Sequence, residues 1–151
     1  MLPKHHILLG FIFSLVTFFL FSQIGTLGGV VIFLSSFLID FDHYIYYIFK
    51  KKDFSLKRAY LWYKEKGEKI DRTKINLRKN YFVAHYYFHG IEWIFLFVAL
   101  GYFLNEFFLF VSLGMVFHLF LDWITSIIKH DNLSKFSLIL DTLNKKNLKQ
   151  I

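Results

Sequence analysis

The sequence contains no cysteine and only one proline. The lack of cysteine excludes a disulfide framework and a thiolate metal site, so any metal ion must be held by histidine, aspartate or glutamate. With a single proline and no low-complexity tract, the composition argues against a disordered chain. The sequence therefore indicates a folded protein whose metal chemistry would depend on nitrogen and oxygen donors.

Apolar residues are in excess: 56% of the 151 residues are hydrophobic, and 21 are phenylalanine. Four segments are long and apolar enough to predict transmembrane helices, because about 20 such residues cross a bilayer. In lipid the backbone must bond within its own segment, and the alternation typical of strands is absent. The first segment lacks a signal-peptide cleavage site, so we expect it to stay in the mature protein. We predict an all-α, polytopic single membrane domain with helices at about 5–22, 27–49, 81–104 and 107–128.

The two short links within the predicted helix pairs contain no lysine or arginine. The cations lie instead near the amino end, in the loop 50–80 and in the tail 129–151. That loop alone has twelve lysines and arginines against four acids, a net charge of +8. By the positive-inside rule, this side is predicted to be cytoplasmic. We therefore expect a multi-pass protein of the plasma (inner) membrane with both termini in the cytoplasm.

The basic loop also contains aromatic residues, a combination that occurs in nucleic-acid-binding patches. We favour topological charge together with an interfacial helix over roughly 55–66, so we expect membrane lipids as partners rather than nucleic acid. In the tail, the apolar spacing over 133–148 predicts an amphipathic surface helix.

Ionisable residues interrupt the apolar segments, although an acid or cation near the bilayer centre costs at least ~2.5–3.5 kcal/mol. At ~1.5 Å of helix per residue, these residues all fall in the cytoplasmic half, so we expect them to converge on one layer. His5 and His6 stand at the mouth of the first segment. Inside the segments lie Asp40, Asp42, His43, His85, His89, Glu92, His118 and Asp122.

The spacing in the third and fourth segments places these groups on shared helix faces. His85, His89 and Glu92 follow i, i+4, i+7, which is one stripe of a straight helix. His118 and Asp122 follow i, i+4. Both segments are thus predicted to present imidazole and carboxylate groups in one direction.

In the second segment, Asp40 and His43 share a face at i, i+3, whereas Asp42 points elsewhere on a straight helix. Either the helix unwinds there, or Asp42 orients a metal ligand without binding the ion. Acids and neutral imidazoles contain no fixed cation of their own. A divalent metal ion, Zn²⁺ or Mn²⁺ in preference to Mg²⁺, supplies that charge in the interior of a bundle. The candidate metal ligands are His6, Asp40, Asp42, His43, His85, His89, Glu92, His118 and Asp122.

Four short motifs resemble one protein family: "HILLG" in the first segment, "DFDH" in the second, "HYYFHGIE" in the third and "HLFLD" in the fourth. They are similar to H-x-x-x-G, P-D-x-D-H, H-R-x-x-T-H and H-x-x-x-D. These are the motifs of bacterial and archaeal inner-membrane proteins described as membrane-bound metal-dependent hydrolases, the YdjM-like family. The resemblance covers the four-helix core and favours His6 over His5. It implies these metal ligands or their neighbours: His6, Asp40, Asp42, His43, His89, His118 and Asp122.

The chain departs from the family pattern at two places. Ile39 stands where the family usually has proline, and the third motif lacks the arginine and the hydroxyl residue but gains Glu92. Because an arginine can bind a phosphate group through two hydrogen bonds, its absence leaves the identity of the substrate open.

These features predict a metal-dependent hydrolase that acts on a lipid or other phosphoester, with Asp42 or Glu92 as general base. One alternative is a non-enzymatic metal-binding protein or a divalent-cation or proton carrier. A di-iron membrane oxidase is a further alternative, although the additional ligand pairs of that class are missing.

Overall fold

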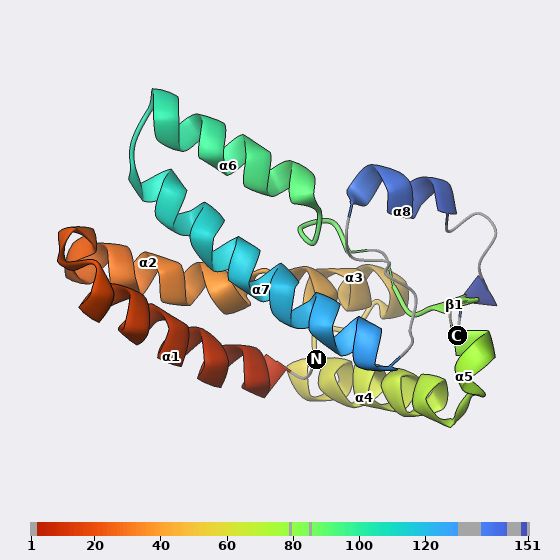
Figure 1. The fold of residues 1–151 in the computed structure, drawn as a ribbon. Helices are drawn as coiled ribbons and strands as arrows, with labels where there is room; N and C mark the ends of the chain where they lie inside the picture. Colours follow the sequence, from red (N-terminus) through yellow and green to blue (C-terminus); the bar gives the residue numbers. More distant parts are fainter. Residues whose placement is uncertain (1–2, 79, 85, 130–136, 145–148, 151) are drawn as a thin grey trace. The chain divides into compact units, whose positions relative to one another are not determined.

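The computed structural model describes residues 3–78, 80–84, 86–129, 137–144 and 149–150. These residues are mostly helical, as the sequence predicts (Figure 1). Contacts divide the chain into two compact units. Unit 1 comprises Met1–Asp40 and Ile91–Asp122, and unit 2 comprises Phe41–Gly90 and Trp123–Ile151.

Unit 1 begins with a pair of apolar helices. Helix α1 (Pro3–Leu20) is followed by a 3₁₀ turn, η1 (Ser22–Ile24), and by α2 (Gly25–Leu38). Figure 1 shows α1 and α2 side by side, joined at this turn. The hydroxyl of Ser14 donates a hydrogen bond to the carbonyl of Gly29 at 2.7 Å, which connects the two helices. Such a bond satisfies a polar side chain inside an otherwise apolar helix pair.

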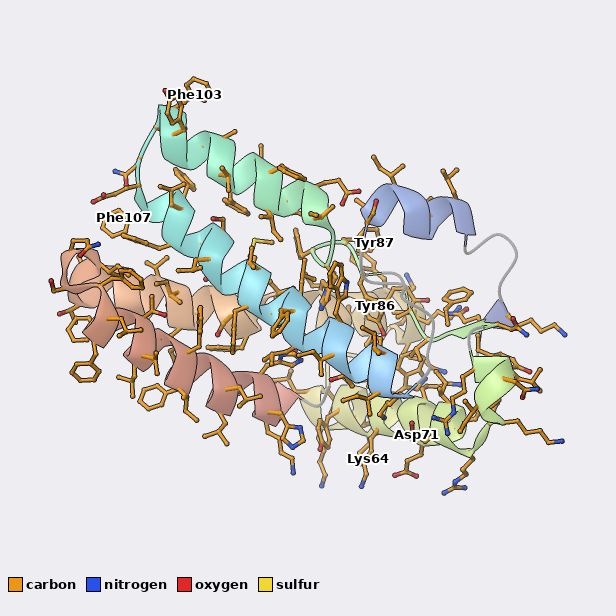
Figure 2. The ribbon with its side chains drawn as sticks, viewed as in Figure 1. Lys64, Asp71, Tyr86, Tyr87, Phe103 and Phe107 are labelled. Carbon is orange, nitrogen blue, oxygen red and sulfur yellow. The ribbon has the colours of Figure 1, made fainter. Side chains whose placement is uncertain are left out.

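Two further helices, α6 (Ile91–Phe103) and α7 (Phe107–Lys129), follow each other with a short link. Figure 2 shows Phe103 and Phe107 at the two ends of that link. Helix α7 contacts α2 closely at Gly114, where a Cβ atom would lie only 2.5 Å from the carbonyl oxygen of Ile32. Glycine is therefore needed at this position for the two backbones to approach.

Unit 2 contains the shorter and more polar elements. Its first helix, α3, has Asp42 in its first turn and Lys50 and Lys51 in its last turn, which matches the helix dipole at both ends. Strands β1 and β2 form one short parallel pair. The described elements are α3 (Phe41–Lys51), α4 (Leu56–Arg72), α5 (Ile75–Arg78), β1 (Tyr81–Phe82), α8 (Leu138–Asn144) and β2 (Lys149–Gln150).

Helix α4 begins one residue after the start of the helix predicted over 55–66 and continues to Arg72. Its N-cap is Ser55, whose hydroxyl accepts a hydrogen bond from the backbone N–H of Arg58 at 3.3 Å. Helix α8 falls within the predicted tail helix 133–148, of which 133–136 and 145–148 lie outside the described residues.

Among the described residues, two helical stretches are long and apolar enough to cross a membrane: Ser22–Lys51, which includes α2 and α3, and Phe107–Lys129. Helices α1 and α6 are apolar as well, but they are shorter. Of the four predicted transmembrane helices, two therefore have the required length and composition.

The second predicted helix is interrupted, since α2 ends at Leu38 and α3 begins at Phe41. In a continuous helix the N–H of Asp40 would bond to the carbonyl of Ser36. It donates instead to Phe37, at 3.1 Å, and the Ser36 carbonyl accepts a hydrogen bond from Nδ1 of His118 at 2.8 Å. The helix thus breaks where the imidazole of His118, from α7, bonds to a carbonyl group that a continuous helix would use.

The third predicted helix begins at Ile91 instead of residue 81. Before it, the carboxylate of Asp42 accepts hydrogen bonds from the N–H of Phe88 and from Nδ1 of His89, each at 3.0 Å. These bonds hold the backbone in a non-helical conformation. The prediction that His89 and Glu92 share a helix face with His85 is therefore wrong, because His89 precedes the helix. His85 lies outside the described residues.

Candidate metal centre

Four predicted site residues meet in unit 1, and we call them the His6 cluster: His6, Asp40, His118 and Asp122. His6 comes from the start of α1, Asp40 from the turn after α2, and the other two from successive turns of α7. Nε2 of His6 lies 3.3 Å from Oδ1 of Asp122. Nε2 of His118 lies 3.6 Å from Oδ2 of Asp122 and 3.6 Å from Oδ1 of Asp40. The cluster thus surrounds one small volume with two imidazoles and two carboxylates.

His6 and His118 are fully buried, and Asp122 is 2% exposed, whereas Asp40 is 12% exposed. Neither ring nitrogen of His6 has a hydrogen-bond partner among the described residues. Its Nε2 faces Asp122 at 3.3 Å but without the geometry of a hydrogen bond. A buried polar group that lacks such a bond costs free energy, and a metal ion bound to one of these nitrogens would offset that cost.

The ring of His118 is oriented by the backbone of α2. Its Nδ1 lies 2.8 Å from the carbonyl oxygen of Ser36, which can only accept, so Nδ1 carries the hydrogen. In the neutral imidazole, Nε2 is then the nitrogen with a lone pair, and it faces Asp40 and Asp122. A histidine held in this way by a carbonyl is typical of metal sites.

The donor set of the His6 cluster fits a divalent metal ion. Ligand bonds of about 2.1 Å in a tetrahedral arrangement place neighbouring donor atoms about 3.4 Å apart. The measured separations are 3.3 and 3.6 Å. One ligand atom from each of His6, His118 and Asp122 lies within 4.8 Å of the others. Imidazole and carboxylate together suit Zn²⁺, Mn²⁺ or Fe²⁺, and the metal's identity is left open by these distances.

A second group, the Asp42 cluster (Asp42, His43 and His89), lies in unit 2. Oδ1 of Asp42 accepts a hydrogen bond from Nδ1 of His43 at 2.8 Å, and Oδ2 accepts one from Nδ1 of His89 at 3.0 Å. Because a carboxylate can only accept, both Nδ1 atoms carry hydrogen, and in the neutral imidazole Nε2 is the nitrogen of each ring that can bind a metal ion. Asp42 is 1% exposed, so these bonds form away from water.

Two tyrosines surround His43 in unit 2. The ring of Tyr86 lies 4.2 Å from the imidazole of His43, and the hydroxyl of Tyr63 donates to the His43 carbonyl at 2.9 Å. Burial raises the pKa of Tyr63 well above its usual range, so the hydroxyl stays protonated and remains a donor. These tyrosines, like Ser36, are not identifiable from the sequence, because nothing in their spacing separates them from the other aromatic and small residues.

The remaining predicted residues are placed as follows. His5 is exposed, so His6 is the histidine of the first motif that enters a cluster. Glu92 stands in the first turn of α6 and belongs to neither cluster. The predicted site residues thus form two groups, and those in a cluster are His6, Asp40, Asp42, His43, His89, His118 and Asp122.

No family model, no curated protein and no solved structure matches this chain. The resemblance to membrane-bound metal-dependent hydrolases therefore stays a prediction, and the case for a function rests on the geometry of the two clusters.

Proposed function

We propose that this chain is a multi-pass membrane protein that binds a divalent metal ion in the His6 cluster and hydrolyses a lipid or other phosphoester. One observation carries the proposal. His6 is fully buried beside Asp122 and His118, and its two nitrogens have no hydrogen-bond partner in the described part of the chain. A metal ion would use the lone pair that the fold leaves in this position.

Each residue of the His6 cluster has a separate part in this proposal. His6, His118 and Asp122 hold the ion, and the Ser36 carbonyl fixes the ring of His118. Asp40 is the most exposed member, at 12%, so in this proposal it is the member nearest to water or substrate. A bound divalent ion lowers the pKa of water and polarises a phosphoryl or acyl oxygen.

The Asp42 cluster has a positioning role in the proposal. Both carboxylate oxygens of Asp42 accept hydrogen bonds, so this acid is better suited to orienting His43 and His89 than to acting as general base. Two imidazoles that a carboxylate orients in this way are suited to bind a second metal ion. Glu92 remains the other candidate for general base that the sequence indicates.

The membrane location rests on length, composition and charge. Two helical stretches can cross a bilayer, and α1 and α6 would complete a four-helix bundle by tilting or by local thinning of the bilayer. The lysines and arginines indicate a cytoplasmic loop and cytoplasmic termini. Along α7, Asp122 lies about 10 Å from Lys129, which would place the site close to the lipid headgroups. Lipid phosphoesters lie at that depth, which supports a lipid among the proposed substrates.

The test uses protein purified in mild detergent. We expect stoichiometric Zn²⁺ or Mn²⁺ by elemental analysis, and hydrolysis of at least one member of a panel of lipid and soluble phosphoesters and esters. His118→Ala and Asp40→Ala should lower both metal content and activity. His5→Ala, which changes an exposed histidine next to His6, should leave both unchanged.

One alternative is favoured by a specific observation. Three of the four residues in the His6 cluster are at most 2% exposed, as is common for a structural ion. Under that alternative the metal would bind stoichiometrically, no substrate in the panel would be hydrolysed, and metal removal would lower thermal stability. A carrier would instead move metal ions across proteoliposomes.

A further inference from the structure

We propose that residues 54–61 form a contact site for anionic phospholipids. Apolar side chains at the start of α4 enter the headgroup region of the cytoplasmic leaflet, and the lysines beside them bind lipid phosphates. This inference rests on the proposed membrane location but not on the metal site or on catalysis.

The apolar part of this surface is exposed in the described structure. Phe54 is 75% exposed, Leu56 66%, Leu61 51% and Tyr60 44%. Helix α4 also packs inside unit 2, where Ala59 is buried. Four large apolar side chains within eight residues are thus exposed, and we call residues 54–61 with these side chains the apolar patch; water is an unfavourable environment for it.

Cations flank this patch. Between positions 50 and 61 the sequence has four lysines, one arginine and one acid. Asp53, that single acid, accepts hydrogen bonds from Nε and Nη2 of Arg58, both at 2.6 Å. The four lysines at 50, 51, 52 and 57 are exposed, and their charge attracts an anionic surface.

The local backbone keeps this patch near the end of a candidate membrane span. The apolar stretch Ser22–Lys51 ends three residues before Phe54, which is at most about 10 Å of chain. After α3, Lys52 adopts a left-handed conformation with φ 54°, so the chain turns there. The hydroxyl of Tyr47 donates to Asp53 at 2.6 Å and ties the start of α4 to α3. Residues 54–61 therefore stay at the level of the headgroups if α3 spans the leaflet.

A lipid surface explains this composition better than a nucleic acid does. A phosphate backbone would use the lysines but would leave Phe54 and Leu56 in water. The headgroup region of a bilayer accommodates both the lysines and the apolar side chains, because its phosphates lie directly above the first acyl carbons. Figure 2 shows Lys64 and Asp71 farther along α4, where both charge signs occur and the apolar patch has ended.

The absence of cysteine allows a direct test with single-cysteine variants that carry an environment-sensitive fluorophore. Phe54→Cys reports the proposed contact, and Glu68→Cys on the exposed part of α4 where both charge signs occur is the matched control. Phe120→Cys on α7 reports membrane insertion independently. The full chain is reconstituted in phosphatidylcholine vesicles with or without phosphatidylglycerol, and lipids spin-labelled at the headgroup or deep in the acyl chain act as quenchers.

We expect headgroup-labelled lipid to quench the Phe54→Cys fluorophore, about threefold more strongly with phosphatidylglycerol present, and high salt to remove the difference. Glu68→Cys should stay unquenched. Adding Lys51→Gln and Lys57→Gln should remove the phosphatidylglycerol effect.

Each other outcome counts against the inference. Deep quenching at Phe120→Cys without quenching at Phe54→Cys overturns the lipid contact and leaves the membrane location intact. No quenching at Phe120→Cys overturns both. A response of the Phe54→Cys fluorophore to duplex DNA but not to phosphatidylglycerol would assign the surface to nucleic acid instead.

Discussion

The imidazole rings of His6 and His118 stack with their centroids 4.1 Å apart and their planes inclined by 22°. This stacking directs Nε2 of each ring toward a different oxygen of the single carboxylate of Asp122, at 3.3 and 3.6 Å. These separations are longer than good hydrogen bonds but suit donors that share a metal ion. The arrangement is therefore compatible with a cation held between these three side chains.

His6→Phe tests this explanation. Phenylalanine keeps a ring against His118 but removes both nitrogens that lack hydrogen-bond partners in the described structure. An unsatisfied buried group costs about 1–3 kcal/mol, so in chelator the variant should unfold at the same temperature as wild type or higher. With Zn²⁺ or Mn²⁺ at about 100 times the dissociation constant, wild type should gain about 2.7 kcal/mol and the variant almost nothing. Thermal unfolding in detergent measures both effects.

The control for this experiment is His5→Phe. His5 is the neighbouring residue and is exposed, so its variant should gain as much stability from metal as wild type does. If His6→Phe kept the full metal-dependent stabilisation, the His6 cluster would not be the site that binds the ion.

Asp42→Asn tests the positioning of the two histidines in unit 2. The amide has one accepting oxygen, and its NH₂ group opposes the N–H of the second imidazole. Either His43 or His89 therefore loses its partner. Removing such an orienting carboxylate typically lowers metal affinity by about 10–100-fold. Metal titration should show that loss in Asp42→Asn but not in Asp71→Asn, an exposed acid on α4. Unchanged affinity would assign Asp42 a purely structural role.

The site residues are easier to predict from the sequence than the helix boundaries. Acids and histidines within apolar segments stand out because their burial is costly, and this contrast alone singles out His118 and Asp122. The sequence also predicts helix α7 to within one residue, since its apolar run is uninterrupted from Phe107 to Lys129. Local composition is therefore sufficient to single out these two residues and to predict the bounds of α7.

The errors arise where a side chain from a distant part of the sequence competes for backbone hydrogen bonds. The break after α2 depends on His118, 82 residues from the Ser36 carbonyl that it bonds. The non-helical segment before α6 depends on Asp42, 46 residues from Phe88. Periodicity describes only neighbours along the chain, so it reveals neither interruption.

The hydrogen bonds of Asp53 predict that the stability of the α3–α4 connection depends on pH. Hydrogen bonds from Arg58, then from Tyr47 and the N–H of Ser55, hold the pKa of Asp53 well below its usual range. Since the folded-state pKa is the lower one, the stabilisation is complete above the unfolded pKa of about 3.9 and is lost as the pH falls further. Asp53→Asn should therefore lower the melting temperature at pH 7, and the difference from wild type should shrink below about pH 4. Glu65→Gln, which changes an exposed acid of α4, is the control. A difference that did not change with pH would contradict the assignment.

Gly114→Ala links helix packing to the metal site. A Cβ atom at this position would lie 2.5 Å from the carbonyl of Ile32 and 3.0 Å from the N–H of Ser36, so α2 and α7 must separate. Overpacking of this kind costs about 1–3 kcal/mol. It should also lengthen the bond from His118 to the Ser36 carbonyl and weaken metal binding in the His6 cluster. Gly67→Ala is the matched control, because no heavy atom lies within 4 Å of the added Cβ in the described structure, and alanine should stabilise α4 by about 0.5–1 kcal/mol. Loss of stability in Gly114→Ala with wild-type metal affinity would show that the closeness of α2 and α7 does not control the ring of His118.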